Sequence, residues 1–233
     1  MKINKKTIIT ILILLSAFLV CDYCFARAGG GGGGGGGGSG SGRWSILGYI
    51  LAPIIFIYSI IMTVVARRKN EKVKKLLGEI SKKDAVWNLE YMTASAQQIF
   101  YIVQKAWTNR NQDIAREYMS NNIYTKHSKQ TDEMVAKGTK NILEEINLDE
   151  VLVYSISDFK NDSFDTFSAI MTGSMIDYSI DKKESIISGS DSKSESFKEI
   201  WIFIRKDDKW VLDEIKPEAN LGDINAGSAF SEQ

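Results

Sequence analysis

The sequence predicts an α+β domain preceded by a membrane anchor, and three observations lead to this prediction. Residues 44–66 form a run of 23 residues without a charge, which is long enough to cross a bilayer. After residue 84, apolar residues recur every three or four positions, as in helices. From residue 151 the apolar period changes to two, which is typical of strands. We therefore expect about three helices packed on a curved antiparallel sheet of about four strands.

Residues 1–28 have the layout of a secretory signal peptide, with a basic start, an apolar run and Ala26-Arg27-Ala28 as a small-x-small cleavage site. If cleavage fails, the segment stays as a first membrane helix. Cys21 and Cys24 are the only cysteines and both lie here, so we expect no disulfide or thiolate chemistry in the folded domain. The glycine-rich tract 29–43 is expected to be a flexible spacer outside the membrane.

The run 44–66 is predicted to be a transmembrane helix, because about 20 residues rising about 1.5 Å each cross about 30 Å of hydrocarbon. Pro53 predicts a bend within it. The alternative is a buried core helix of a soluble protein. Basic residues follow at once, and their excess predicts that this end faces the cytoplasm and contacts anionic lipid. They are Arg67, Arg68, Lys69, Lys72, Lys74 and Lys75.

Residues 67–83 are predicted to form a basic juxtamembrane helix with a narrow apolar stripe of Val73, Leu76, Leu77 and Ile80. This helix either lies on lipid, packs on the domain or simply continues the spanning helix. The segment carries eight Lys or Arg against two Glu, whereas residues 84–233 carry sixteen Lys or Arg against twenty-six Asp or Glu. An acidic body of this kind argues against a nucleic-acid partner.

The domain is expected over 84–217 and begins with helices. A long helix is predicted from about Asn88 to Thr108, a shorter one from Asp113 to Met119, and a third between Ser128 and Ile146 with Gly138 as its weak point. Strands are predicted at 151–156, 164–178, 199–204 and 210–215, the last two forming a hairpin around the polar turn 205–209. We expect 188–196 to be a serine-rich loop and 218–233 to be a disordered tail.

The element order resembles the Tim44 family, together with Phe100, Gln104-Lys105-Ala106-Trp107 and the closing pair Trp201-Ile202-Phe203 and Trp210-Val211-Leu212. That family is named for a mitochondrial inner-membrane import translocase subunit, and its domain has the cone-shaped fold of nuclear transport factor two. The resemblance covers about 84–216. Bacterial members of the family have the same order of signal, glycine tract, membrane span and domain. The resemblance therefore implies a scaffold tethered to the inner membrane of a bacterium, which binds protein partners or lipid or another apolar ligand and is similar to the import-motor scaffold. Ribosome tethering is a related implication.

Aromatic side chains are the candidates for the core or pocket of such a cone. They are Phe100, Trp107, Tyr118, Tyr154, Tyr178, Trp201, Phe203 and Trp210. Enzymes also occur on this fold, with an inward Tyr or Asp acting on a small apolar substrate, and Asp177 would join three of these tyrosines in that alternative. His127 is the only histidine and is interpreted as a surface residue of a polar connector. Because no motif for a catalytic group, metal or cofactor is present, we expect a non-catalytic protein without a cofactor.

Overall fold

The computed structural model describes residues 44–232, with side chains from Pro53 onward. The predicted signal peptide and glycine-rich tract lie outside the described residues. The elements in chain order are α2 (Trp44–Ile80), η1 (Ala85–Trp87), α3 (Leu89–Thr108), η2 (Gln112–Tyr118), α4 (Asn121–Lys137), β1 (Lys140–Asp158), η3 (Asp162–Phe164), β2 (Thr166–Ile180), β3 (Ile186–Lys206), β4 (Lys209–Lys216), α5 (Leu221–Ala226) and β5 (Ala229–Ser231).

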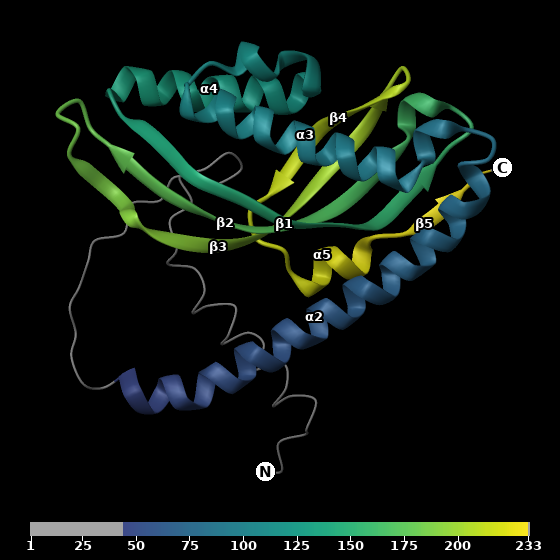
Figure 1. Ribbon diagram of the computed structural model, residues 1–233, viewed down its shortest axis with the longest axis horizontal. Coiled ribbons are helices and arrows are strands. Elements are labelled where there is room, and N and C mark those ends of the chain that lie inside the picture. Colours follow the sequence, from purple (N-terminus) through teal and green to yellow (C-terminus); the bar gives the residue numbers. More distant parts are fainter. Residues whose placement is uncertain (1–43, 233) are drawn as a thin grey trace, which may run out of the picture.

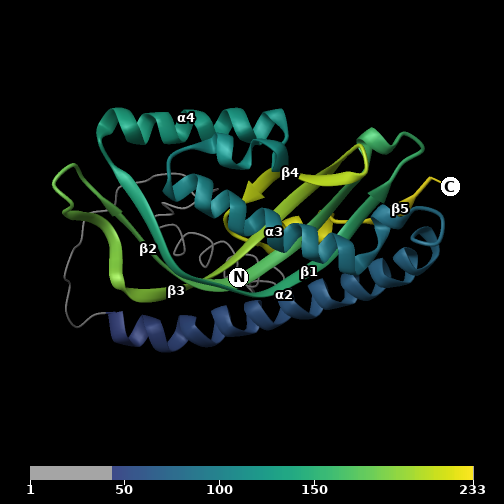
Figure 2. The ribbon, with the colours of Figure 1, turned by 45° about the horizontal axis from the view of Figure 1, so that its top comes forward.

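The predicted α+β architecture is present, but the sheet is larger than expected and mixed. Five strands lie in the order β4-β3-β2-β1-β5, of which β1 to β4 pair antiparallel. The fifth strand pairs parallel with β1, Ile156 opposite Ala229. The sheet curls around α3 and α4 on its concave face, while α2 and α5 lie on its convex face (Figure 1). The rotated view keeps α4 and α2 on opposite sides of the sheet (Figure 2).

The long helix α3 confirms the prediction from its apolar spacing. Asn88 caps its start, because the side chain accepts the Tyr91 backbone N–H at 3.0 Å. One broad face is buried against the sheet, including Met92, Ala96 and Val103. The shorter helix that follows is the 3₁₀ helix η2 rather than an α-helix.

The predicted third helix ends earlier than its apolar pattern indicated. Gly138 adopts a left-handed conformation at φ 67° and closes α4, so it acts as a C-cap and not as a weak point inside a helix. Ile142, Leu143 and Ile146 belong instead to β1, where Ile142 pairs with Tyr178 of β2. Apolar residues three and four apart fit both a helix and a bulged strand, and β1 contains a register shift after Glu144.

Two segments predicted to lack structure are ordered. The serine-rich stretch 188–196 is part of β3 and pairs with β2, with Ser194 opposite Ile176. This stretch has the exposed, polar side chains that are typical of a loop. Pairing with the long strand β2 nevertheless gives its backbone N–H and C=O groups hydrogen-bond partners. The tail forms α5, capped by Asn220, and β5. Ile224 of α5 is fully buried, which explains why this polar tail is fixed to the domain. The predicted hairpin is confirmed, with Lys206 paired to Lys209.

The segments predicted as a spanning helix and a juxtamembrane helix form one continuous helix, α2, which contains Pro53. Among the residues that the structure describes, no helix combines the length and the apolarity needed to cross a membrane. Of the alternatives for its second half, the apolar stripe packs on the domain: Val73, Leu77 and Ile80 are buried in the main core. The apolar stripe of the second half of α2 is therefore covered by the rest of the domain.

Candidate functional site

One face of α2 is attached to the convex face of the sheet. Met62 and Ala66 are buried there, 4% and 1% exposed, with the half-buried Tyr58 and Val65 beside them. The sheet and α5 supply an apolar surface, which we call the convex groove, made of Leu152, Tyr154, Ile170, Ile200 and Ile224. Residues at a spacing of four place Tyr58, Met62 and Ala66 on one helix face, as helix packing requires.

Polar contacts reinforce this attachment at both ends. The Tyr58 hydroxyl accepts the backbone N–H of Leu221 at 3.1 Å. The Lys69 ammonium donates to two carbonyls at the end of α5, Asn225 at 3.0 Å and Gly227. The Asn70 amide donates to the Val153 carbonyl at 2.7 Å and is buried. Burial, and secondly the charge of nearby Lys72, lower the pKa of Lys69. Lys69 therefore contacts the domain.

The outward face of α2 is apolar over three turns and then basic. Its apolar part, which we call the outer ridge, comprises six large side chains that are 42% to 66% exposed: Ile55, Phe56, Ile57, Ile60, Ile61 and Val64. Single exposed apolar residues are ordinary on protein surfaces, but contiguous patches mark interaction sites. The outer ridge holds six of the exposed large apolar side chains in the described part of the chain, within ten consecutive residues of one helix.

The predicted lipid-contacting cations divide into two groups. Arg67 pairs with Glu150 at 2.7 Å and Lys74 pairs with Glu71 at 3.0 Å, so with Lys69 they already have partners on the protein. Arg68, Lys72 and Lys75 are exposed, and no ion pair of theirs is found within residues 53–232. These three continue the outer ridge toward the C-terminal end of α2.

The concave face of the sheet holds the main core. Five of the eight predicted pocket or core residues are buried here: Phe100, Trp107, Trp201, Phe203 and Trp210. Phe100 stacks on Phe197 with ring centroids 5.6 Å apart and contacts Trp201 at 5.3 Å. Tyr118 is partly buried against this core. Packed rings thus occupy the space between α3 and the sheet.

Two of the predicted tyrosines lie elsewhere. Tyr154 belongs to the convex groove, where burial raises its pKa to about 12. The Tyr178 hydroxyl donates to Glu144 at 3.4 Å near the surface, and burial is the largest cause that raises its pKa. Asp177 accepts an N–H of Asn141 at 2.7 Å. The residues of the enzyme alternative are therefore not brought together at one site.

Several polar groups are buried in the helical layer, and His127 is among them. It was predicted to lie on the surface, yet it is fully buried in α4 with its ring 5.4 Å from that of Trp107. Neither ring nitrogen has a hydrogen-bond partner in the described part of the chain, and the same holds for the side chains of Gln104 and Gln112. Burial, followed by the charge of Lys126, lowers the pKa of His127 to about 4. His127 is thus a neutral packing residue at neutral pH.

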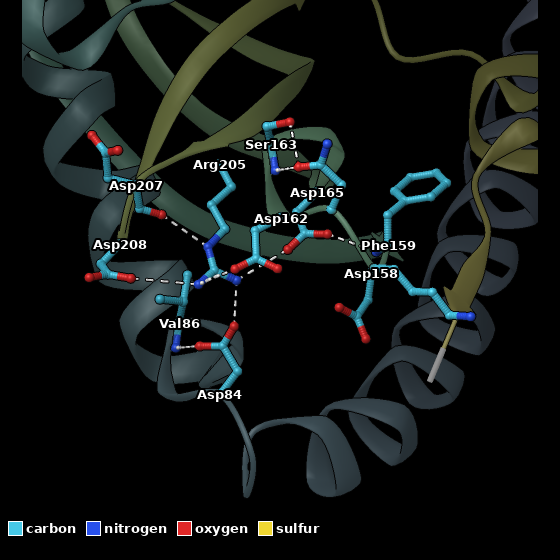
Figure 3. Close-up of polar contacts among 12 residues, drawn as sticks. Asp84, Val86, Asp158, Phe159, Asp162, Ser163, Asp165, Arg205, Asp207 and Asp208 are labelled. Atoms are coloured by element: carbon cyan, nitrogen blue, oxygen red, sulfur yellow. Dashed lines mark hydrogen bonds and ion pairs between the residues drawn. The ribbon is translucent and has the colours of Figure 1, made fainter.

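A buried arginine surrounded by carboxylates is the main feature that the sequence did not predict. Arg205 pairs with Asp84, with Asp165 at 3.2 Å and with Asp162 at 3.3 Å, and its Nε donates to the Asp207 carbonyl at 3.0 Å (Figure 3). The Asp165 carboxylate also accepts the Phe159 backbone N–H. Burial raises the pKa of Asp165, although these contacts favour its charged form.

A cavity of about 240 Å³ lies beside this cluster, between the end of α2 and the C-terminal ends of β1 and β5. Its walls include Ile80, Trp87 and Phe159 together with charged residues of both signs, which are Asp84, Asp158, Asp162, Glu232, Lys83 and Lys160. Within the described residues, no group of three or more His, Cys, Asp or Glu is arranged to hold a metal ion. The Arg205 contacts join the hairpin turn to the start of the domain.

No sequence signal distinguished Arg205 from the other charges of the turn 205–209, because a buried ion pair depends on residues far apart in the chain. Asp84 and Arg205 are 121 positions apart. The convex groove was missed for the same reason, although Tyr154, Ile200 and Ile202 alternate in the sequence with residues of the main core. That alternation is the signal that both faces of the sheet are covered.

Comparison with known proteins identifies a family. The family model of the Tim44-like domain matches residues 73–217, which is more than half of the chain. No curated protein matches the chain. Among solved structures, the crystal structure of the intermembrane space region of the chloroplast protein ARC6 is similar, at 12% identity and a TM-score of 0.40, over 55% of this chain and 97% of that chain.

Proposed function

This chain belongs to the Tim44-like domain family, and on that premise we propose that it is a membrane-anchored, non-catalytic interaction module. The anchor is α2, with the predicted span 44–66 and the exposed basic residues behind it. The domain then holds protein partners at the cytoplasmic face of a bacterial inner membrane, similar to a translocase scaffold. Binding of lipid or another apolar ligand is part of the same proposal.

The outer ridge is the observation that carries the proposal. Its six large apolar side chains are exposed, and the three exposed cations Arg68, Lys72 and Lys75 follow on the same helix. Burial of apolar surface in lipid favours membrane binding by about 25 cal/mol per Å². Each cation near an anionic leaflet adds about 1 kcal/mol to the binding free energy. An apolar end followed by a basic end suits a helix that enters a bilayer from its anionic side.

The test is flotation of the full chain with vesicles of phosphatidylglycerol and phosphatidylethanolamine. We expect the native chain to float with the vesicles and the double variant Phe56→Lys/Ile60→Lys to remain largely in solution, because both residues are exposed and contribute little to folding. Ile187→Lys is the matched control, since Ile187 is 54% exposed but lies on β3. Equal flotation of all three proteins would show that α2 is not the anchor.

Orientation is tested separately with a reporter fused after Gln233. A cytoplasmic domain predicts fluorescence of a reporter that folds in the cytoplasm and no activity of a phosphatase that requires export. Phosphatase activity would contradict the proposed orientation, whatever the flotation result.

A further inference from the structure

The first half of α2 can span a membrane or pack on the domain, but it cannot do both at once. The sequence predicts that 44–66 spans a bilayer, while in the structure Tyr58, Met62 and Ala66 lie on the convex groove. If these contacts persist, only residues 44–57 remain to enter hydrocarbon. These 14 residues reach about 21 Å, short of the roughly 30 Å that a span requires, and Arg43 and the glycine-rich tract precede them. A spanning helix must therefore leave the groove.

We propose that the convex groove is a helix-binding site, closed by the chain's own α2 in this structure and opened for the amphipathic helix of a partner when α2 spans the membrane. This inference rests on the proposed membrane function. It goes further because it names the surface that membrane insertion exposes and the kind of partner that fits it.

The two halves of α2 contact different parts of the domain, and only the contacts of the first half must break for the groove to open. Val73, Leu77 and Ile80 pack in the main core, so the second half of α2 keeps the domain attached. The first half, from Tyr58 to Lys69, contacts the convex groove and the α5 region, and two exposed polar contacts join it to the sheet, Arg67 with Glu150 and Thr63 with Lys198. The outer ridge of this first half is left exposed in the closed state, and lipid would cover both it and the released face. Burial of α2 in lipid thus offsets its release from the groove.

The chemistry of the partner follows from how α2 itself binds. The groove accepts one apolar and one small residue four positions apart, Met62 and Ala66, and then a cation that reaches two carbonyls at the end of α5. Glu150 lies at the rim and pairs with Arg67. The fitting partner is accordingly a basic amphipathic helix, which lays its apolar face into the groove.

Cysteine labelling of the full chain tests the opening. In a background where Cys21 and Cys24 are replaced by Ser, Ile170→Cys places a thiol in the groove, and Met171→Cys places the matched control on the opposite face of the same strand. Both native side chains are buried, at 2% and 0% exposure. In vesicles of phosphatidylglycerol and phosphatidylethanolamine, we expect a water-soluble maleimide to label the cysteine at 170 at least tenfold faster than the one at 171.

Adding Phe56→Lys/Ile60→Lys, which keeps α2 out of lipid, should restore protection at position 170. Flotation with protection of both cysteines would overturn the inference and leave the membrane function standing. Failure to float would overturn the membrane function itself. Equal, fast labelling at 170 and 171 would mean that the domain unfolds on the vesicles and would also overturn the inference.

A peptide tests the partner. It comprises residues 57–72 with Ile57, Ile60, Ile61 and Val64 replaced by Gln, so it retains only the groove-binding face and dissolves in water. We expect fluorescence anisotropy to show binding to the native chain in vesicles, and at least tenfold weaker binding when the peptide also carries Met62→Asp or when the chain carries Phe56→Lys/Ile60→Lys. Labelling at position 170 without peptide binding would overturn the helix-binding role.

Discussion

The indole N–H of Trp107 donates to the side-chain oxygen of Asn141 at 2.9 Å, which joins the last turn of α3 to the first residues of β1. The Asn141 amide in turn donates to Asp177 at 2.7 Å and to the Tyr178 carbonyl at 3.0 Å, both on β2. All of these groups lie at the end of the sheet where β1 begins. Trp107 therefore links the C-terminal end of α3 to both strands at this end of the sheet, beside the other packed rings of the core.

Replacing Trp107 should strongly destabilise the domain. We expect Trp107→Ala to lower the free energy of unfolding by about 3–5 kcal/mol, because it leaves a large cavity and removes the indole N–H that the Asn141 side-chain oxygen accepts. Trp107→Phe, which keeps most of the ring volume, should cost less. Urea denaturation of the full chain measures both. Tyr101→Ala is the control, since Tyr101 is on the same helix but 45% exposed. A midpoint for Trp107→Ala equal to that of the control would contradict the burial.

Acid should destabilise the domain through His127. Its pKa is about 4 in the folded state and about 6.5 in an unfolded chain, so the unfolded state binds the proton more readily. Stability should therefore fall as the pH drops from about 6.5 to about 4, by about 3 kcal/mol from this group. His127→Leu should remove this part of the pH dependence. The slope of unfolding free energy against pH, compared between the two proteins, is the measurement; identical slopes would show that His127 is not buried as a neutral group.

Arg205 should be more important than a surface arginine. Arg205→Met leaves the fully buried Asp165 without its cation, and breaking a buried pair in this way costs about 3–5 kcal/mol. Adding Asp165→Asn should recover part of the loss. Lys206→Met, one residue further along the hairpin and exposed, is the control and should change stability by less than about 0.5 kcal/mol. Equal stability of the Arg205 and Lys206 variants in thermal unfolding would refute this role.

The basic residues of α2 should differ in their contribution to lipid binding. Lys72→Ala/Lys75→Ala removes two exposed cations and should weaken binding to phosphatidylglycerol vesicles by about 2 kcal/mol at low salt. Lys69→Ala should have a smaller net effect on binding, because it also removes the contacts with the α5 carbonyls that hold α2 on the domain and oppose its entry into lipid. Vesicle titrations at two salt concentrations measure the difference. A larger loss for Lys69 would place that side chain on the lipid.

Local patterns were sufficient for part of the fold. The spacing of apolar residues located α3, and the alternation of large residues around 205–209 located the closing hairpin. Contacts between residues near in sequence determine the helix, and a tight turn determines the hairpin. The end of α4 was misplaced because Gly138 was interpreted as a defect, although a glycine after a helical run followed by a change of period indicates a C-cap.

Long-range contacts decided the remainder. The stretch 188–196 is a strand because β2 extends far enough to pair with it, and the tail is ordered because Ile224 reaches the convex groove. For the site, the sequence identified the apolar run and the cations of α2 but not which side of the helix each occupies. That division depends on the groove, which is assembled from β1, β2, β3 and α5.

Crosslinking in native membranes, followed by mass spectrometry, tests whether this chain is an interaction module. We expect the full chain to trap the same few proteins in repeated experiments, and the single variants Asp177→Ala and Tyr178→Ala, made at residues of the enzyme alternative, to trap the same set. The variant Phe56→Lys/Ile60→Lys should lose that set because it leaves the membrane. A purified domain that instead carries a defined small molecule and converts it, with turnover abolished by one of those single variants, would contradict the interaction module and establish an enzyme.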